Sequence, residues 1–138
     1  MNQQQKSESG KESEKEESST YFHVFTYRIP KRKHDELLSV QKKLAKIYKK
    51  HGTLNSQILQ LGKSNIFEGF SGFEKELGTK DGEEIWIEID TYKNAKEFAK
   101  TVTEIGTDAD AGPLWGELSQ IATEHPIIMG EFEQLTRV

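Results

Sequence analysis

The chain has 138 residues and no cysteine, and 30% of its residues are charged. This length suits one domain with a real core and is short for two ordinary domains. The lack of cysteine excludes disulfides, thiolate metal ligands and a cysteine nucleophile. There is no apolar run long enough to span a bilayer and no apolar signal-peptide core, so we expect a cytoplasmic protein without a membrane partner.

Charge is distributed unevenly along the chain, although the net charge is only −4. Residues 21–50 carry nine Lys and Arg against two acidic residues, whereas residues 51–138 carry seven against sixteen. A basic first helix can meet an anionic partner, its own acidic domain or a second copy of the chain. Arg28, Lys31, Arg32 and Lys33 form a basic cluster around the entry of this helix. The cluster has no interleaved aromatic stacking surface and the domain is acidic overall, so a nucleic acid is not the expected partner.

Residues 1–20 consist almost entirely of Ser, Glu, Lys and Gln and contain no aromatic residue. Such a composition cannot bury apolar surface, so we expect a disordered polar tail. The folded domain is then expected to occupy residues 21–138.

The first half of the domain begins with a strand at residues 21–29, rich in aromatic and β-branched residues and ended by Pro30. Apolar residues then recur at helical spacing over residues 31–50, and Gly52 is a suitable helix stop. A half-polar strand is expected at residues 54–61.

Residues 63–83 form a long connection with four glycines and with Phe67, Phe70 and Phe73 at every third position. Exposed phenylalanines on a free loop favour aggregation, so we expect them to pack against a partner subunit or over a cavity. Asp81-Gly82 is typical of a tight turn leading into the next strand.

Residues 84–90 alternate strictly, with isoleucine at every odd position. This two-residue period predicts a strand with the isoleucines on one face and Trp86 and Glu88 on the other. Amphipathic helices are expected at residues 95–105 and 113–122, and a last strand at 127–135. The order β-α-β-β-α-α-β predicts a ferredoxin-like α+β sandwich: a four-stranded antiparallel sheet of strand order 4-1-3-2 with helices on one face.

We expect the isoleucines of the third strand to face the helices, and Ile128, Gly130 and Phe132 to do the same. The opposite, open face is then too apolar to remain in water, which predicts a homodimer whose two sheets enclose a barrel. The barrel interior is the predicted small-molecule pocket. The side chains expected on the open face are His23, Phe25, Tyr27, Asn55, Gln57, Leu59, Trp86, Glu88, Met129 and Glu131, of which Phe25, Tyr27, Gln57, Trp86 and Met129 are the predicted pocket residues.

From Tyr21 to Leu135 the chain resembles the dimeric α/β-barrel superfamily, and within it a bacterial and archaeal group described as a domain of unknown function. The resemblance rests on Ile29-Pro30-Lys31, His51-Gly52, the long loop before Gly82-Glu83, the aromatic third strand and Gly130-Glu131-Phe132. It implies a dimer and leaves the activity open, since the superfamily includes cofactor-free monooxygenases, haem-degrading enzymes, isomerases and proteins without known activity.

The haem-degrading members use an asparagine, a tryptophan and an iron-binding histidine. Trp86 matches the tryptophan, but the helix at residues 93–105 contains no histidine and His23 stands where the asparagine belongs. We therefore expect no haem, and no other cofactor.

The best candidate catalytic group consists of His23, Glu88 and Glu131. A histidine beside carboxylates on neighbouring strands can abstract a proton from an acidic phenol or enol. The same group can instead be a histidine satisfied by a carboxylate in a dimer interface. It can also be read as a metal site, but its spacing is not diagnostic of one and no metal is expected.

Two hypotheses remain open. The first is a small-molecule enzyme or binding protein that resembles a cofactor-independent oxygenase or isomerase. The second is a non-catalytic structural or interaction protein whose open face only forms the dimer. They differ in whether the interior of the dimeric barrel is hollow.

Overall fold

The computed structural model describes residues 19–122 and 126–137. Most of the predicted polar tail lies outside this range. Among the described residues, the helices are all too short or too polar to cross a membrane.

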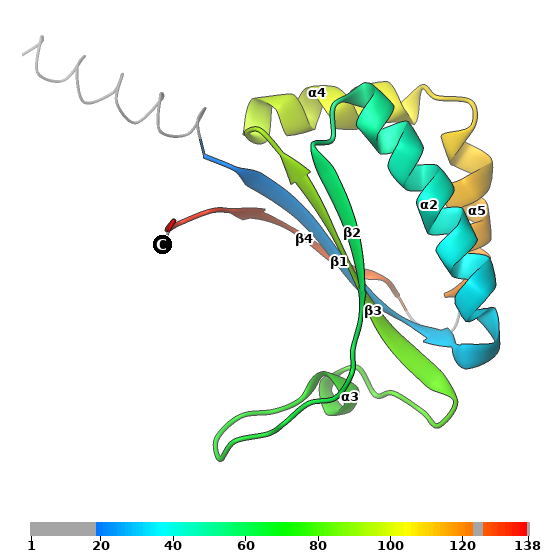
Figure 1. Cartoon of the computed structure of the whole chain (residues 1–138), viewed down its shortest axis with the longest axis vertical. Helices are drawn as coiled ribbons and strands as arrows, with labels where there is room; N and C mark the ends of the chain where they lie inside the picture. The colour runs from blue at the N-terminus through cyan, green and yellow to red at the C-terminus, as the bar shows by residue number, and fades with distance from the viewer. Residues whose placement is uncertain (1–18, 123–125, 138) are drawn as a thin grey trace, which may run out of the picture.

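Four antiparallel strands form one sheet in the order β2-β3-β1-β4, which confirms the predicted topology. The strands are β1 (Tyr21–Pro30), β2 (Asn55–Gln60), β3 (Glu83–Tyr92) and β4 (Ile128–Glu133). A short 3-10 turn η1 (Lys31–Lys33) leads into helix α2 (His34–His51), and the later helices are α4 (Ala95–Gly106) and α5 (Ala111–Ile121). Figure 1 shows these three α-helices together on one face of the sheet.

The helices begin and end where their local sequence favours it. In α2 the apolar residues Leu37, Val40 and Leu44 are buried and form the stripe that faces the sheet. Gly52 ends α2 with a φ of 124°, a conformation that favours glycine. At the start of α4, the Asn94 side chain accepts a hydrogen bond from the backbone N–H of Glu97 at 2.8 Å.

The predicted assignment of the two sheet faces is wrong for β1, β3 and β4. Tyr27 and Trp86 lie opposite each other on neighbouring strands and pack with Leu44 of α2 in the core. Trp86 is only 1% exposed. Large aromatic side chains bury more apolar surface than isoleucine does, and here the aromatic residues rather than the isoleucines of β3 face the helices. The residues registered on this helix-covered face are His23, Phe25, Tyr27, Trp86, Glu88, Asp90, Met129 and Glu131.

The open face carries the aliphatic set instead. Ile87 and Ile89 of β3 lie there beside Val24 of β1, and all three are partly exposed. Ile128, Gly130 and Phe132, which were expected to face the helices, also register on this side. For β2 the prediction is correct: Asn55, Gln57 and Leu59 lie on the open face.

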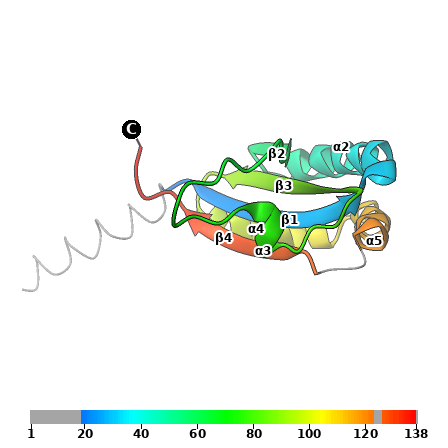
Figure 2. The ribbon, with the colours of Figure 1, turned by 90° about the horizontal axis from the view of Figure 1, so that it is seen from below.

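The connection between β2 and β3 extends past one end of the sheet (Figure 1) and lies in front of it in the view from below (Figure 2). It contains one helical turn, α3 (Phe73–Glu76). Phe67 and Phe70 are each 72% exposed, so their expected packing against a partner stays a prediction. The base of the connection is fixed, because the backbone N–H of Lys31 donates to Gly82 at 2.8 Å.

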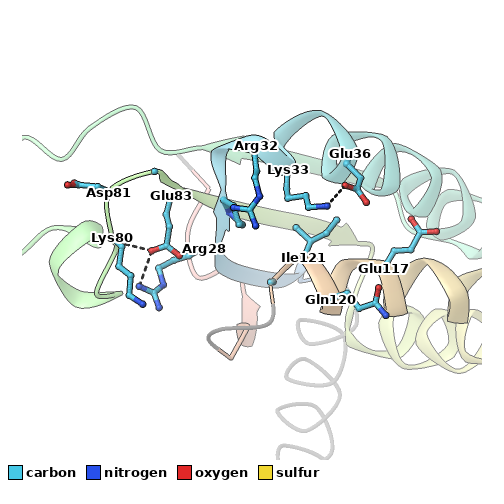
Figure 3. A pocket seen from close by; sticks show the side chains of 13 residues that line it. Arg28, Arg32, Lys33, Glu36, Lys80, Asp81, Glu83, Glu117, Gln120 and Ile121 are labelled. Atoms are coloured by element: carbon cyan, nitrogen blue, oxygen red, sulfur yellow. Dashed lines mark hydrogen bonds and ion pairs between the residues drawn. The ribbon is translucent and has the colours of Figure 1, made fainter.

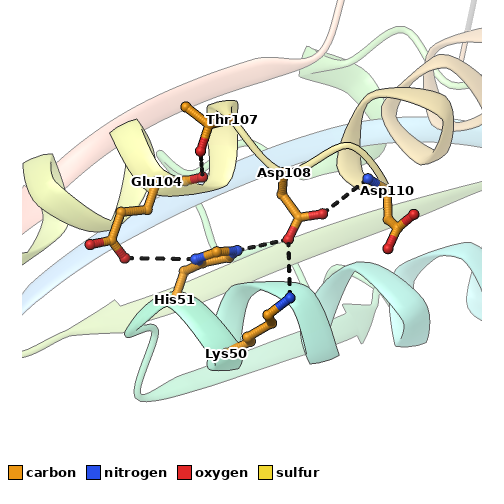
Figure 4. A network of polar contacts seen from close by, with 6 residues as sticks. All are labelled: Lys50, His51, Glu104, Thr107, Asp108 and Asp110. Carbon is orange, nitrogen blue, oxygen red and sulfur yellow. Dashed lines mark hydrogen bonds and ion pairs between the residues drawn. The ribbon is translucent and has the colours of Figure 1, made fainter.

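A polar network joins the end of α2 to the connection between α4 and α5 (Figure 4). His51 Nε2 lies 2.7 Å from Asp108 Oδ2, and His51 Nδ1 lies 3.6 Å from Glu104 Oε2. Lys50 Nζ is 3.8 Å from the same Asp108 oxygen. This network ties the helices to one another above the helix-covered face.

Candidate functional site

A cavity of about 300 Å³ lies between the helix-covered face and the helices. This volume is at the lower end of the range for small-molecule sites, roughly 300–1,000 Å³. The domain is therefore hollow on the side where the sequence predicted solid core. Its lining is His23, Phe25, Tyr27, Tyr48, Glu88, Asp90, Tyr92, Val102, Ile105, Trp115, Leu118, Ile127 and Met129.

Residues from two helices meet at one wall of the cavity. The indole N–H of Trp115 on α5 donates a hydrogen bond to the hydroxyl of Tyr48 on α2 at 2.9 Å. Tyr48 is buried, whereas Trp115 and Val102 of α4 are partly exposed to solvent. Trp115 therefore lies between the cavity and the outside, where a bound molecule would change its surroundings.

His23 provides a hydrogen-bonding atom without a partner. Its Nε2 is buried and has no hydrogen-bond partner within the part of the chain that the structure describes. Its ring packs against Phe25 at 4.2 Å and edge-on against Phe98 of α4 at 5.1 Å between centroids. Burial lowers the pKa of His23, although the charges of Asp90 and Glu131 act in the opposite direction. The imidazole is thus neutral near pH 7 and able to accept a proton or a hydrogen bond.

A pair of buried carboxyl groups forms another part of the lining. Glu88 is 3% exposed and Asp90 is 2% exposed. Burial, the hydrogen bond with Asp90 and the charge of Asp90 raise the pKa of Glu88 well above its usual value. Ser56 of β2 donates its hydroxyl to Asp90 Oδ1 at 2.6 Å.

The structure brings some of the predicted site residues together and separates others. His23 and Glu88 both line the cavity. Glu131 lies opposite His23 in the β1–β4 ladder but is exposed, and its carboxylate accepts the hydroxyl of Tyr21 at 2.6 Å. Glu131 is not part of the lining. The predicted group of His23, Glu88 and Glu131 is therefore not brought together. Asp90, rather than Glu131, lines the cavity with the other two.

Of the five predicted pocket residues, Phe25, Tyr27 and Met129 line the cavity. Trp86 does not, because it is enclosed in the core, where its indole N–H donates to Glu84 at 3.0 Å. Gln57 faces the opposite side of the sheet.

Sequence reasoning missed Asp90 and the contributions from the helices. Tyr48 lies in the helix predicted at residues 31–50 and Trp115 in the one predicted at residues 113–122, where their spacing is that of ordinary core residues. Asp90 continues the even-numbered positions of the third strand after Trp86 and Glu88. A carboxylate at this next position of the same face, on a strand predicted to be central, was the available signal for a buried acidic pair.

A second hollow of about 330 Å³ lies near the start of α2 and the end of α5 (Figure 3). Its lining includes four basic and four acidic residues, so it has no net charge for an ionic ligand. Arg28, which the sequence placed in a basic cluster, is buried here and pairs with Glu83 at 3.3 Å and with the carbonyl of Gly78. The cluster is thus partly a structural anchor for the β2–β3 connection.

No protein-family model matches the sequence, and no curated protein is significantly similar to it. Several solved structures are similar in fold. A dimeric ferredoxin-like protein from an uncultured marine organism is 12% identical, with a TM-score of 0.59 over 87% of this chain and 99% of that chain.

Two further neighbours are named as enzymes. SnoaB, a cofactor-independent oxygenase from Streptomyces nogalater, is 13% identical, with a TM-score of 0.54 over 86% of this chain and 96% of its own. A hydroxynitrile lyase from Passiflora edulis is 10% identical, with a TM-score of 0.52 over 88% and 98%. At these identities the likeness concerns the fold alone. The resemblance inferred from the sequence is confirmed at that level: the chain has the ferredoxin-like α+β fold of these proteins.

Proposed function

We propose that this chain binds a small, partly apolar molecule in the cavity between the sheet and the helices, and that His23 receives a proton or hydrogen bond from it. The observation that carries this proposal is a buried, unpartnered His23 Nε2 beside a hollow lined by aromatic and aliphatic side chains. Buried polar atoms nearly always have partners, so an unpartnered one beside a cavity favours a missing ligand.

The chemistry that suits a neutral, half-buried imidazole with a buried Nε2 is proton removal from an acidic hydroxyl or enol. The proton would move to Nε2 and the electron pair would remain on the ligand. The fold shared with SnoaB supports this direction without fixing the reaction.

We also propose that the open face joins two copies of the chain into a homodimer. Val24, Ile87 and Ile89 give this face an apolar centre, and Leu59 and Phe132 add exposed apolar side chains. The neighbouring structures include dimeric ferredoxin-like proteins. In such an assembly the space between the two sheets is the interface, and the ligand sites lie outside it, one in each copy. The cytoplasmic location expected from the sequence stays a prediction.

Calorimetric titration with 2-naphthol, a small apolar molecule with an acidic hydroxyl, tests the binding function. We expect saturable binding to the wild type and about tenfold weaker binding to His23→Ala, because one hydrogen bond is lost. His34→Ala is the matched control, since His34 lies outside the cavity lining. It should bind like the wild type.

The non-catalytic alternative makes the opposite prediction. If the domain only forms a dimer, 2-naphthol will not bind to the wild type at all. Equal weakening in both histidine variants would instead mean that His23 acts through the fold rather than through the ligand.

A further inference from the structure

The carboxyl pair of Glu88 and Asp90 has no positive partner. Neither group forms an ion pair with a lysine, arginine or histidine among the described residues. The cavity lining, as far as the structure describes it, also contains no lysine or arginine. Buried carboxylates in proteins are ordinarily paired or bound to a cation, so this pair is unusual.

The neighbours of the pair orient it without neutralising it. Ser56 donates its hydroxyl to Asp90, and the Gln41 side chain forms a hydrogen bond with Glu88. Gln41 is itself buried and donates through Nε2 to the hydroxyl of Tyr27 at 2.7 Å. The carboxyl groups are therefore held in position at the wall of the cavity by neutral donors.

Two adjacent buried carboxyl groups cannot both ionise freely, and a proton shared between them leaves one negative charge on the pair. The raised pKa of Glu88 agrees with this. Keeping one charge in a largely apolar cavity is unfavourable. Arrangements of this kind cluster at functional sites, where a ligand supplies the missing charge.

The remaining walls suit a cation as well. The rings of Phe25, Tyr27, Tyr48, Tyr92 and Trp115 line the same cavity. Aromatic faces attract an ammonium group by a cation–π interaction, and the attraction strengthens when the group is shielded from water. Burial, followed by the negative charges of Glu88 and Asp90, raises the pKa of Tyr48, which keeps its ring neutral.

We propose that the ligand is a small aromatic amine in its protonated form, with the ammonium group against the Glu88–Asp90 pair and a hydroxyl directed to His23. This rests on the proposed function, whose ligand it specifies. His23 lies opposite Asp90 in the β1–β3 ladder, and Glu88 is the diagonal neighbour of His23. All three residues line the same cavity, so one ligand can contact them together.

The ammonium group also resolves an electrostatic difficulty in the proton transfer. A phenolate formed next to a negatively charged carboxyl pair would be repelled by it. An ammonium group on the same ligand compensates the charge of the pair, so that the proton can pass from the hydroxyl to His23 without two uncompensated negative charges in the cavity.

Tyramine and tyrosol provide a matched test. Both carry the same phenol, but tyramine ends in an ammonium group where tyrosol ends in a neutral hydroxyl. We expect the wild-type protein to bind tyramine at least tenfold more tightly in calorimetric titrations, because a buried carboxylate gains a charge-assisted partner. Asp90→Asn should weaken the binding of tyramine more than that of tyrosol and so reduce this preference, because the ammonium group loses one of its two carboxyl partners.

Equal affinities of the wild type for tyramine and tyrosol would overturn the amine assignment while leaving the proposed function intact. If neither compound binds, the proposed function fails and this inference fails with it. The wild-type comparison decides the question even if Asp90→Asn does not fold, which its melting curve would show.

Discussion

The two faces of the sheet differ in what they bury and in what they leave open. Trp86 and Ile87 are neighbours in β3, yet Trp86 is enclosed by the helices and Ile87 lies partly exposed on the open face. The helix-covered face combines large aromatic rings with buried polar groups around a hollow, whereas the open face presents Val24, Ile87, Ile89 and the exposed ring of Phe132. Polar groups and a cavity are typical of ligand binding, while an exposed apolar face is typical of an interface between copies.

The largest expected effect is on the free energy of unfolding. It should differ between Trp86 and Ile87, which are adjacent in β3 but lie on opposite faces of the sheet. Trp86→Ala should destabilise the domain by about 3–5 kcal/mol, because it leaves a cavity in the core. Ile87→Ala should cost about 1 kcal/mol or less in dilute protein, as its side chain is only partly covered. Chemical denaturation of both variants measures the difference. A reversed order would mean that the isoleucines, not the aromatic residues, face the helices.

A charge introduced on the open face should dissociate the proposed dimer without affecting ligand binding in the cavity. Ile87→Lys places an ammonium group in the proposed interface, where it would lose its water without a partner. We expect sedimentation velocity to show a monomer that still binds 2-naphthol. Ala99→Lys, at an exposed position of α4, is the control and should remain a dimer. A dimeric Ile87→Lys would assign the interface to another surface.

The buried carboxyl pair on the helix-covered face should make the stability of the domain depend on pH. The raised pKa means that folded Glu88 keeps a proton that the unfolded chain releases above pH 4.5. The wild type therefore loses stability as the pH rises from 4.5 toward the folded-state pKa, and Glu88→Gln, which cannot ionise, escapes this loss. The stability of the variant relative to the wild type should grow with pH in denaturation curves. A constant difference would show that Glu88 is ionised when folded.

The smallest expected effect is on the melting temperature, through the contact between His51 and Asp108 that joins the helices. Asp108→Asn weakens the contact with His51, whose hydrogen bond holds the pKa of Asp108 below its usual 3.8. The stabilisation is present above pH 3.8 and is lost as the pH falls through the lowered folded-state pKa. The variant should melt slightly below the wild type at neutral pH. The two melting temperatures should converge in acid, and a gap that persists there would mean that the ion pair is not its cause.

Much of the fold could be predicted from the sequence because periodicity and turn residues are local signals. The alternation in residues 84–90 identified a central strand, and Gly52 marked the end of the first helix. The order of elements then restricted the topology to the one observed. Periodicity separates two faces of a strand but does not indicate which one is covered, and that choice was wrong for three of the four strands.

The candidate site was predictable only in part for the same reason. His23, Phe25, Tyr27, Glu88 and Met129 were correctly grouped on one face, since strand register keeps such sets together whichever face is covered. The contributions of Tyr48 and Trp115 come from helices whose apolar stripes give no sign of a hollow. A cavity depends on how well side chains from different elements fill the space between them, which no local pattern encodes.

Isoleucine methyl groups offer the most direct test of the central claim that the ligand binds on the helix-covered face. Ile105 and Ile127 line the cavity, whereas Ile87 and Ile89 lie on the open face. A methyl NMR spectrum of the wild-type protein, recorded with and without 2-naphthol, compares the two pairs directly. We predict that the signals of Ile105 and Ile127 shift and those of Ile87 and Ile89 stay in place. Shifts confined to Ile87 and Ile89 would place the ligand between the two sheets and contradict the account.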